Sequence, residues 1–308
     1  PSVNVTKREV VYRSPIYFTP LDDDGIDAEA AASLVQKEFC AAEIRPDMLG
    51  SGAVIITGET ARKRNARAVC QSLAELAGDF VVAAAGPDLE SLLAGRGAGA
   101  DVLSGTSGKT VLNIDVGGGT SNICLFRDGA EIDCGCMDIG GRVIRVDDTG
   151  RILKMSPKVY DLLNEIGVPL QIGEILTLPV ARQIAATLAA LLAQGANLAP
   201  LTPLGKRFIT NHGLLPESRP DCICFSGGVG ACMAKPQKDL FAYQDLGVLL
   251  AQAIRESPCF SGMLCLPAAE TMRATVIGAG NCSLEVSGST IACENVHFPL
   301  KGLAVAWV

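Results

Sequence analysis

A short segment in the first half of the sequence joins the end of an apolar strand to a glycine turn. Residues 111–114 are typical of a buried strand, and Asp115 follows them directly. The next residues are a glycine run and a hydroxyl, namely Gly117, Gly118, Gly119 and Thr120. Glycines accept positive φ angles and let a phosphate approach the backbone closely. The segment therefore predicts a strand, a glycine turn and a second strand that form a phosphate and metal site, with Asp115 as metal ligand and catalytic carboxylate.

Two other interpretations of this segment are weaker. In Rossmann and P-loop proteins the glycine loop opens a helix, whereas a second apolar strand follows here. A tight hairpin without a ligand is the remaining alternative, but consecutive glycines weaken a sheet unless something needs the bare backbone. We therefore favour the phosphate and metal site.

A second glycine turn follows another predicted strand. Residues 221–225 form a short apolar run, and the turn after it consists of Ser226, Gly227, Gly228, Val229 and Gly230. A strand that leads into such a loop can press its backbone against a flat or phosphorylated ligand, whereas an ordinary strand-to-helix turn needs only a single glycine. Because both glycine turns fall in the same predicted domain, we expect this loop to bind such a ligand. A further glycine turn, at Gly140 and Gly141, is assigned to the same site.

The composition is that of an α/β protein whose core is mainly aliphatic. Hydrophobic residues make up 48%, charged residues 19% and aromatic residues 5% of the 308 residues. The net charge is −7 and no basic run is longer than residues 62–64, which argues against nucleic acid and anionic membranes as partners. The longest uncharged stretch, residues 184–205, is interrupted by polar residues and prolines, so it is too short for a membrane-spanning helix.

The cysteines point to a reducing environment. There are twelve of them and no recognisable secretory signal, which predicts free thiols in a cytoplasmic protein. Two C-x-C pairs, Cys134 with Cys136 and Cys222 with Cys224, place sulfurs on one face of a strand and could hold a metal. Zinc sites more often use C-x-x-C spacing, so we interpret these thiols as small apolar residues.

We expect two domains, at residues 1–108 and 109–308. Strands and helices alternate in the first domain, which indicates a parallel sheet. The segments predicted there are helices at 28–42, 62–76 and 89–95 and strands at 53–57 and 79–85. Residues 105–110 approach the Walker pattern, but residue 103 is Leu and a strand follows, so residues 95–108 are interpreted as a glycine-rich linker.

The second predicted domain also combines strands with helices. Beyond the two glycine turns, the predicted segments are strands at 131–137 and 263–267, a hairpin around 147–150, helices at 174–192 and 241–256, a small-residue helix from 275 and β-like segments in 289–308. The order predicts an α/β fold in this domain as well.

Both glycine motifs resemble those of a known superfamily. Residues 113–120 and 225–230 are similar to the second phosphate motif and the adenosine motif of the actin-like ATPases. Over its whole length the chain more closely resembles the family of ethanolamine ammonia-lyase reactivating factors, the ethanolamine utilisation proteins A. The segments that carry this resemblance are 7–9, 14–15, 18–20, 55–60, 64–67, 78–83, 138–142 and 273–280.

The resemblance implies two ribonuclease-H-like domains with a nucleotide cleft between them. It also implies a chaperone-like function, in which ATP and Mg²⁺ are used to release damaged cobalamin from ethanolamine ammonia-lyase so that intact adenosylcobalamin can enter. Such a protein is cytoplasmic and is associated with a bacterial microcompartment. The candidate catalytic acids are then Asp115 and Glu59, with Glu90 as a further acid near the cleft.

Two features depart from the family pattern. The first phosphate hairpin of the family is not found, so we expect a first domain that is truncated at its N-terminus and slow or absent ATP hydrolysis. Heat-shock chaperones also place a Glu before the proline where this chain has Gly86 before Pro87. Two alternative functions therefore stay open: a small-molecule kinase of the same superfamily, and a nucleotide-binding scaffold without turnover.

Overall fold

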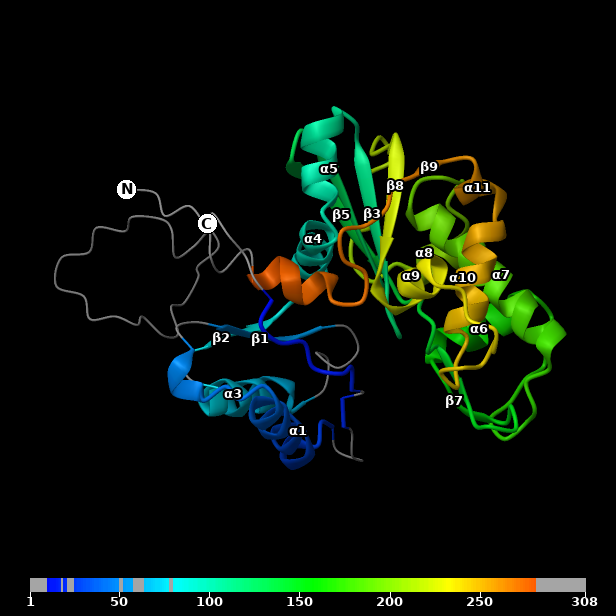
Figure 1. The fold of residues 1–308 in the computed structure, drawn as a ribbon. Helices are drawn as coiled ribbons and strands as arrows, with labels where there is room; N and C mark the ends of the chain where they lie inside the picture. The colour runs from blue at the N-terminus through cyan, green and yellow to red at the C-terminus, as the bar shows by residue number, and fades with distance from the viewer. Residues whose placement is uncertain are drawn as a thin grey trace.

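The structure is a computed structural model that describes residues 10–17, 19–20, 25–49, 52–57, 64–77 and 80–280. Within these residues the chain forms a two-stranded parallel sheet, a five-stranded mixed sheet and a separate two-stranded hairpin, with helices packed around them (Figure 1). Predictions that fall on residues 58–63 and 281–308, including the catalytic role of Glu59, lie outside the described residues.

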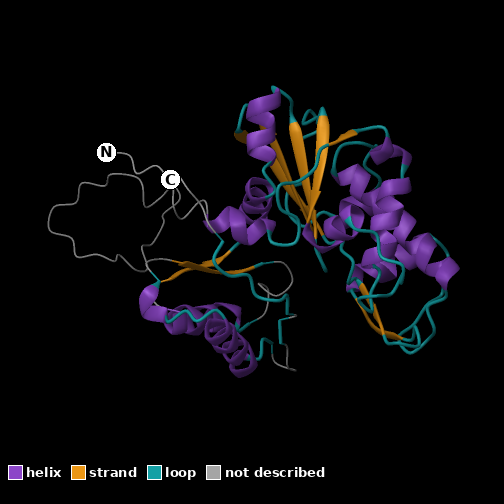
Figure 2. Cartoon of the chain, in the orientation of Figure 1, coloured by secondary structure: helices purple, strands orange, loops and turns teal. Residues whose placement is uncertain are grey.

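The N-terminal part is built on a parallel strand pair, as the sequence predicts. Strand β1 (Gly52–Ile56) pairs in parallel with β2 (Phe80–Ala84), and helix α3 (Ala66–Ala77) packs on both strands. Helix α1 (Ala28–Ala41) packs on α3 and is followed by the short 3₁₀ helix η1 (Pro46–Met48) (Figure 2). Helix α1 begins where it does because the Asp27 carboxylate accepts a hydrogen bond from the backbone N–H of Ala30 at 2.9 Å.

The five-stranded sheet is the centre of the second part, and its strand order is β5-β4-β3-β8-β9. Its strands are β3 (Val111–Val116), β4 (Ser121–Arg127), β5 (Ala130–Met137), β8 (Cys222–Ser226) and β9 (Leu264–Cys265). Neighbours β3, β4 and β5 run antiparallel, whereas β8 runs parallel to β3 and β9 runs parallel to β8. The carboxyl ends of β3 and β8 therefore meet at one edge of the sheet.

The two faces of this sheet pack against different helices. Leu112, Ile114 and Val116 belong to the large core that also contains residues of α7 (Leu178–Gly195) and α10 (Gly247–Glu256). Val111 packs on the opposite face against α5 (Ala100–Ser107), and α4 (Pro87–Gly97) lies across β3, β4 and β5. Because side chains alternate along a strand, Asp115 points to the same face as Val111.

The remaining described elements are a hairpin and four helices. They are the hairpin of β6 (Ile144–Val146) and β7 (Ile152–Met155) and the helices α6 (Pro157–Glu165), α8 (Pro203–Phe208), α9 (Gly227–Ala234) and α11 (Pro258–Ser261). Residues 274–280 are also helical. The predicted hairpin around 147–150 is confirmed, as are the strands predicted near 53–57, 79–85, 131–137 and 221–225.

The predicted linker at residues 95–108 is wrong. Helix α4 continues to Gly97, and α5 follows after the tight turn at Gly99, which has a φ of 78°. Both helices pack on the sheet, so the glycines allow a sharp turn and close contact and do not form a flexible connection. The domain division at 108 and 109 stays a prediction, although α4 and α5 contact the sheet formed by residues beyond it.

Two predicted helices begin later than the sequence suggested. The helix predicted at 174–192 starts at Leu178, because Pro179 in its first turn has no N–H for a helical bond and is tolerated only at that position. The helix predicted at 241–256 starts at Gly247, and Gln244 before it has a left-handed φ of 54° that no helix contains.

Every described cysteine is a free thiol, and burial raises the pKa of Cys124 and Cys224 far above the ordinary value. In the part of the chain that the structure describes, no helix combines the length and the apolar character that crossing a membrane requires.

A glycine contact joins α4 to the helical residues 274–280, which lie beside it in Figure 1. A Cβ atom on Gly97 would lie 1.7 Å from the backbone oxygen of Ala274, and a Cβ atom on Gly278 would lie 1.9 Å from the backbone oxygen of Leu93. The two backbones therefore meet at a distance that only glycine permits.

We predict that Gly97→Ala lowers the free energy of unfolding by about 1–3 kcal/mol, because backbone atoms must move to admit the methyl group. Urea denaturation measures this change. The matched control is Gly86→Ala, whose Cβ atom would meet nothing within 4 Å and whose φ is −67°. Equal stability of the Gly97→Ala and Gly86→Ala proteins would contradict the close contact.

Candidate functional site

A cavity of about 650 Å³ lies where β3 and β8 end. Ligand pockets for small molecules have volumes in this range. Its glycine and hydroxyl lining consists of Thr19, Thr57, Gly117, Gly118, Gly119, Thr120, Gly227, Gly228 and Thr275. Its charged lining consists of Glu90, Asp115, Arg142, Arg145 and Lys154. The structure thus brings both predicted glycine turns and the predicted carboxylate to a single cavity.

The β3–β4 turn is held by the backbone of the segment that follows β5. The N–H of Gly117 donates to the Thr120 carbonyl at 2.9 Å, and the Gly118 carbonyl accepts from the N–H of Arg142 at 2.6 Å. A Cβ atom on Gly140 would lie 2.3 Å from the Gly118 oxygen, so this position requires glycine. Gly140 and its neighbour Gly141 support the turn and lie outside the cavity lining.

The second turn opens a helix, so the loop predicted at residues 226–230 is wrong. Helix α9 begins at Gly227, whose φ of 80° turns the chain sharply out of β8. A Cβ atom there would lie 2.4 Å from the Val116 oxygen, which explains the glycine by close packing against β3. Gly228 lines the cavity, whereas Val229 is buried in the core and Gly230 packs against the backbone of Phe225.

Asp115 is a buried carboxyl group held by a hydrogen-bonded chain. Its side chain is 7% exposed, and Oδ2 accepts from the Ser226 hydroxyl at 2.6 Å. Ser226 Oγ in turn accepts from Asn113 Nδ2 at 3.1 Å. Burial raises the pKa of Asp115 to about 6; the Ser226 hydrogen bond opposes this rise and the charge of Glu90 adds to it. The group is therefore ionised at neutral pH and poorly solvated, as a metal ligand or a base must be.

Three cationic side chains from the β6–β7 hairpin and the segment before it line the same cavity, namely Arg142, Arg145 and Lys154. Arg145 and Lys154 are directly opposite one another in the hairpin register. Arg142 Nε lies 3.6 Å from Asp245 Oδ2. Arg145 and Lys154 were not identified as site residues from the sequence. The signal that could have identified them is a pair of basic residues on the two sides of a predicted hairpin.

Asn122 supplies an unsatisfied acceptor. It lies opposite Asp115 in the β3–β4 register, lines the cavity and is 2% exposed. Its Oδ1 has no hydrogen-bond partner among the described residues. Leaving such an oxygen buried and unpaired costs about 1–3 kcal/mol, so a donor or a cation in the cavity would be stabilised there.

Comparison with known proteins identifies relatives of the chain. The family model described as "Ethanolamine utilisation protein EutA" matches residues 1–308. The ethanolamine ammonia-lyase reactivase EutA of Salmonella typhimurium is 41% identical over 308 residues, and the protein of the same description from Escherichia coli is also 41% identical over 308 residues. These matches cover 99% of this chain but 66% of each relative, so the chain spans slightly less than two thirds of their length.

Comparison with solved structures supports the fold. A member of the Ppx/GppA family from Aquifex aeolicus matches with a TM-score of 0.50 at 11% identity, over 86% of its own chain and 87% of this one. A likeness at this identity concerns the fold alone. The α/β fold expected from the resemblance, that of the actin-like ATPases, is confirmed.

The raised pKa of Asp115 predicts that this residue destabilises the protein without ligand. The unfolded carboxyl group has the ordinary pKa of 3.8 and the folded one a pKa of about 6. Between these values the folded state holds the extra proton, so stability falls as the pH rises through that window. We predict that Asp115→Asn raises the free energy of unfolding by up to about 3 kcal/mol at pH 7.5 and by only about 0.5 kcal/mol at pH 4.

Urea denaturation at both pH values measures this effect, with the exposed Glu217→Gln as control for loss of a carboxylate. A gain that is equal at pH 4 and pH 7.5 would show that the Asp115 charge is not the cause.

Proposed function

Because this chain belongs to the family of the ethanolamine utilisation protein EutA, we propose that it is a nucleotide-dependent reactivating factor for ethanolamine ammonia-lyase. The name of the two curated relatives, ethanolamine ammonia-lyase reactivase, supports this partner. In this proposal the protein uses ATP to release damaged cobalamin from the lyase. It works in the cytoplasm, in association with a bacterial microcompartment.

The observation that carries the proposal is the pairing of two glycine turns at one cavity. Strands β3 and β8 are parallel neighbours, so residues 117–119 and residues 227–228 line the same space. Bare backbone at both turns admits a phosphate chain on one side and a flat base on the other. We propose that residues 117–120 bind the phosphates and that the start of α9 supports the nucleoside.

The charges of the cavity suit a phosphate chain. Arg145 and Lys154 lie opposite one another in the hairpin and both line the cavity, so an anion between them would meet two positive charges. Arg142 follows the segment that holds the glycine turn, so its position is tied to the predicted phosphate site. These three residues are proposed to attract and orient the phosphates.

The acidic side of the cavity suits a hydrated Mg²⁺ ion. Mg²⁺ takes oxygen ligands, keeps several waters and uses only one or two carboxylates. Asp115 offers a carboxylate, and Asn122, whose Oδ1 has no hydrogen-bond partner in the part of the chain that the structure describes, lines the same cavity. These residues would hold the ion, which when bound neutralises charge on the phosphates. Ser226 fixes the orientation of Asp115 through its hydroxyl.

The same carboxylates are the candidates for positioning the attacking water. Asp115 is ionised at neutral pH and can accept a hydrogen bond from a water molecule. Glu90 is 7% exposed and lines the same cavity, so it is a second candidate beside the predicted Glu59. The helix α4 that carries Glu90 also contacts residues 274–280, and Thr275 of that segment lines the cavity. A bound nucleotide would thereby connect several elements whose arrangement the lyase could sense.

We predict that Gly118→Val weakens Mg²⁺-ADP binding at least about tenfold, because the larger side chain enters the space of the phosphates. Its Cβ atom would meet Arg142 Cβ at 3.5 Å, an ordinary contact, so the fold should survive the change. Calorimetric titration measures the affinity. Gly262→Val, outside the cavity, is the control. Unchanged ADP affinity in Gly118→Val would place the nucleotide elsewhere.

The functional test is phosphate release from ATP, measured with and without ethanolamine ammonia-lyase that has been inactivated by damaged cobalamin. We expect ATP-dependent recovery of lyase activity, and a loss of about 100-fold or more in phosphate release for Asp115→Asn. Release that requires a small-molecule acceptor instead of the lyase would indicate a kinase. Nucleotide binding with neither turnover nor lyase recovery would indicate a scaffold.

A further inference from the structure

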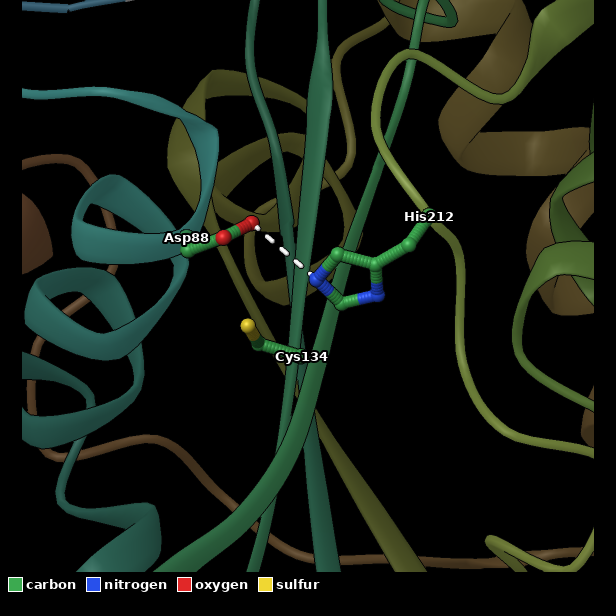
Figure 3. Close-up of side chains that lie close together, drawn as sticks. All are labelled: Asp88, Cys134 and His212. Carbon is green, nitrogen blue, oxygen red and sulfur yellow. Dashed lines mark ion pairs between the residues drawn. The ribbon is translucent and has the colours of Figure 1, made fainter. Parts of the chain in front are cut away.

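Three potential metal ligands meet at the outer side of β5, away from the cavity lining. Asp88 lies in the first turn of α4, Cys134 lies on β5 and His212 lies in the loop after α8. Their ligand atoms all lie within 4.8 Å of one another. Figure 3 shows the three side chains pointing toward one another from these separate elements.

Hydrogen bonds hold the elements that carry these three residues close to one another. The Ser91 hydroxyl donates to the Gly135 carbonyl at 3.0 Å, which holds the first turn of α4 against β5 beside Cys134. Asn211 Oδ1 accepts from the Cys136 N–H at 3.0 Å, and Asn211 Nδ2 donates to Asp88 Oδ1. The residue beside His212 therefore ties the loop both to β5 and to Asp88.

The histidine ring is oriented as a metal ligand would be. His212 Nδ1 lies 2.7 Å from the Gly213 carbonyl oxygen, and because that oxygen can only accept, Nδ1 carries the proton. In the neutral ring Nε2 is then an acceptor, yet it faces Asp88 Oδ1 at 3.5 Å. This contact between Nε2 and the carboxylate oxygen is favourable only if Nε2 also carries a proton or if a cation lies between the two atoms. Metal-binding histidines commonly donate their other N–H to a backbone carbonyl in this way.

The distances between the ligand atoms approach those around a tetrahedral ion. Oxygen and nitrogen ligands of zinc are about 3.4 Å apart at the usual bond lengths, close to the 3.5 Å between Asp88 and His212. Ligand pairs that include sulfur are about 3.6 Å apart, so separations of up to 4.8 Å would have to shorten by about 1 Å at most. Rotation of the exposed Asp88 and His212 side chains can shorten them, whereas Cys134 is buried and fixed.

We propose that Asp88, Cys134 and His212 bind one divalent transition-metal ion of the zinc class, with the fourth position open to water or to a group from a partner. The mixed sulfur, nitrogen and oxygen donors favour such an ion over Mg²⁺, which prefers oxygen alone. The ion would clamp α4 to β5. The first turn of α4 also carries Glu90, so the ion would fix one wall of the nucleotide cavity.

The test is a titration of chelator-treated protein with Co²⁺, which absorbs by charge transfer when a thiolate binds it. We expect one Co²⁺ per chain with thiolate charge transfer, and its displacement by Zn²⁺. Cys134→Ser should remove the charge-transfer band. His212→Gln changes an exposed side chain. It should weaken Co²⁺ binding by more than the roughly 10–100-fold that is typical when a residue hydrogen-bonded to a metal ligand is lost.

The matched control is Cys136→Ser, the other cysteine of the C-x-C pair on the same strand. It should keep the band and the affinity. Loss of the band in Cys136→Ser would place the ion on the cysteine pair and overturn the proposal. Two other results would also overturn the proposal: the absence of a thiolate band in the wild-type protein, and unchanged Co²⁺ affinity in His212→Gln. Either would indicate that Asp88 and His212 form only an ion pair.

Discussion

The parallel pairing of β3 with β8 is the constraint on which the site depends. It aligns Asp115 with Ser226, so the hydroxyl at the end of one strand reaches the carboxylate at the end of the other. A slip of one residue would turn Asp115 toward the apolar core of α7 and α10, because strand side chains alternate between faces. The same pairing brings both glycine turns to one edge, and the buried Asn113 links to Ser226 behind them.

The cavity keeps two polar groups in arrangements that oppose stability. Asp115 is ionised while buried, and Asn122 Oδ1 is unpaired among the described residues. Each arrangement is unfavourable in the protein alone and becomes favourable with an oxygen-rich, multiply charged ligand and a cation. Groups of this kind concentrate at functional sites, where ligand binding offsets the free-energy cost that they impose on the folded protein.

The sequence predicted the parts of the site that are continuous in the chain. The run from Val111 to Thr120 contains the strand, the acid and the turn, so its pattern was sufficient. Contacts between distant segments were not visible. The glycines at 95–108 suggested a linker because Ala274, which requires Gly97 to be bare, lies far along the chain. For the same reason Asp88, Cys134 and His212 gave no signal by spacing, and the helical start at Gly227 depends on packing against Val116.

The central claim is that Asp115 and the two glycine turns form the binding site of a metal–nucleotide complex. A crystal structure of the protein with a non-hydrolysable ATP analogue and Mn²⁺ tests it most directly, because the anomalous signal locates the ion. We expect the Mn²⁺ peak to contact Asp115 directly or through one water, with the phosphates against residues 117–120. An ordered analogue whose phosphates and Mn²⁺ lie away from β3 and β8 would contradict the account.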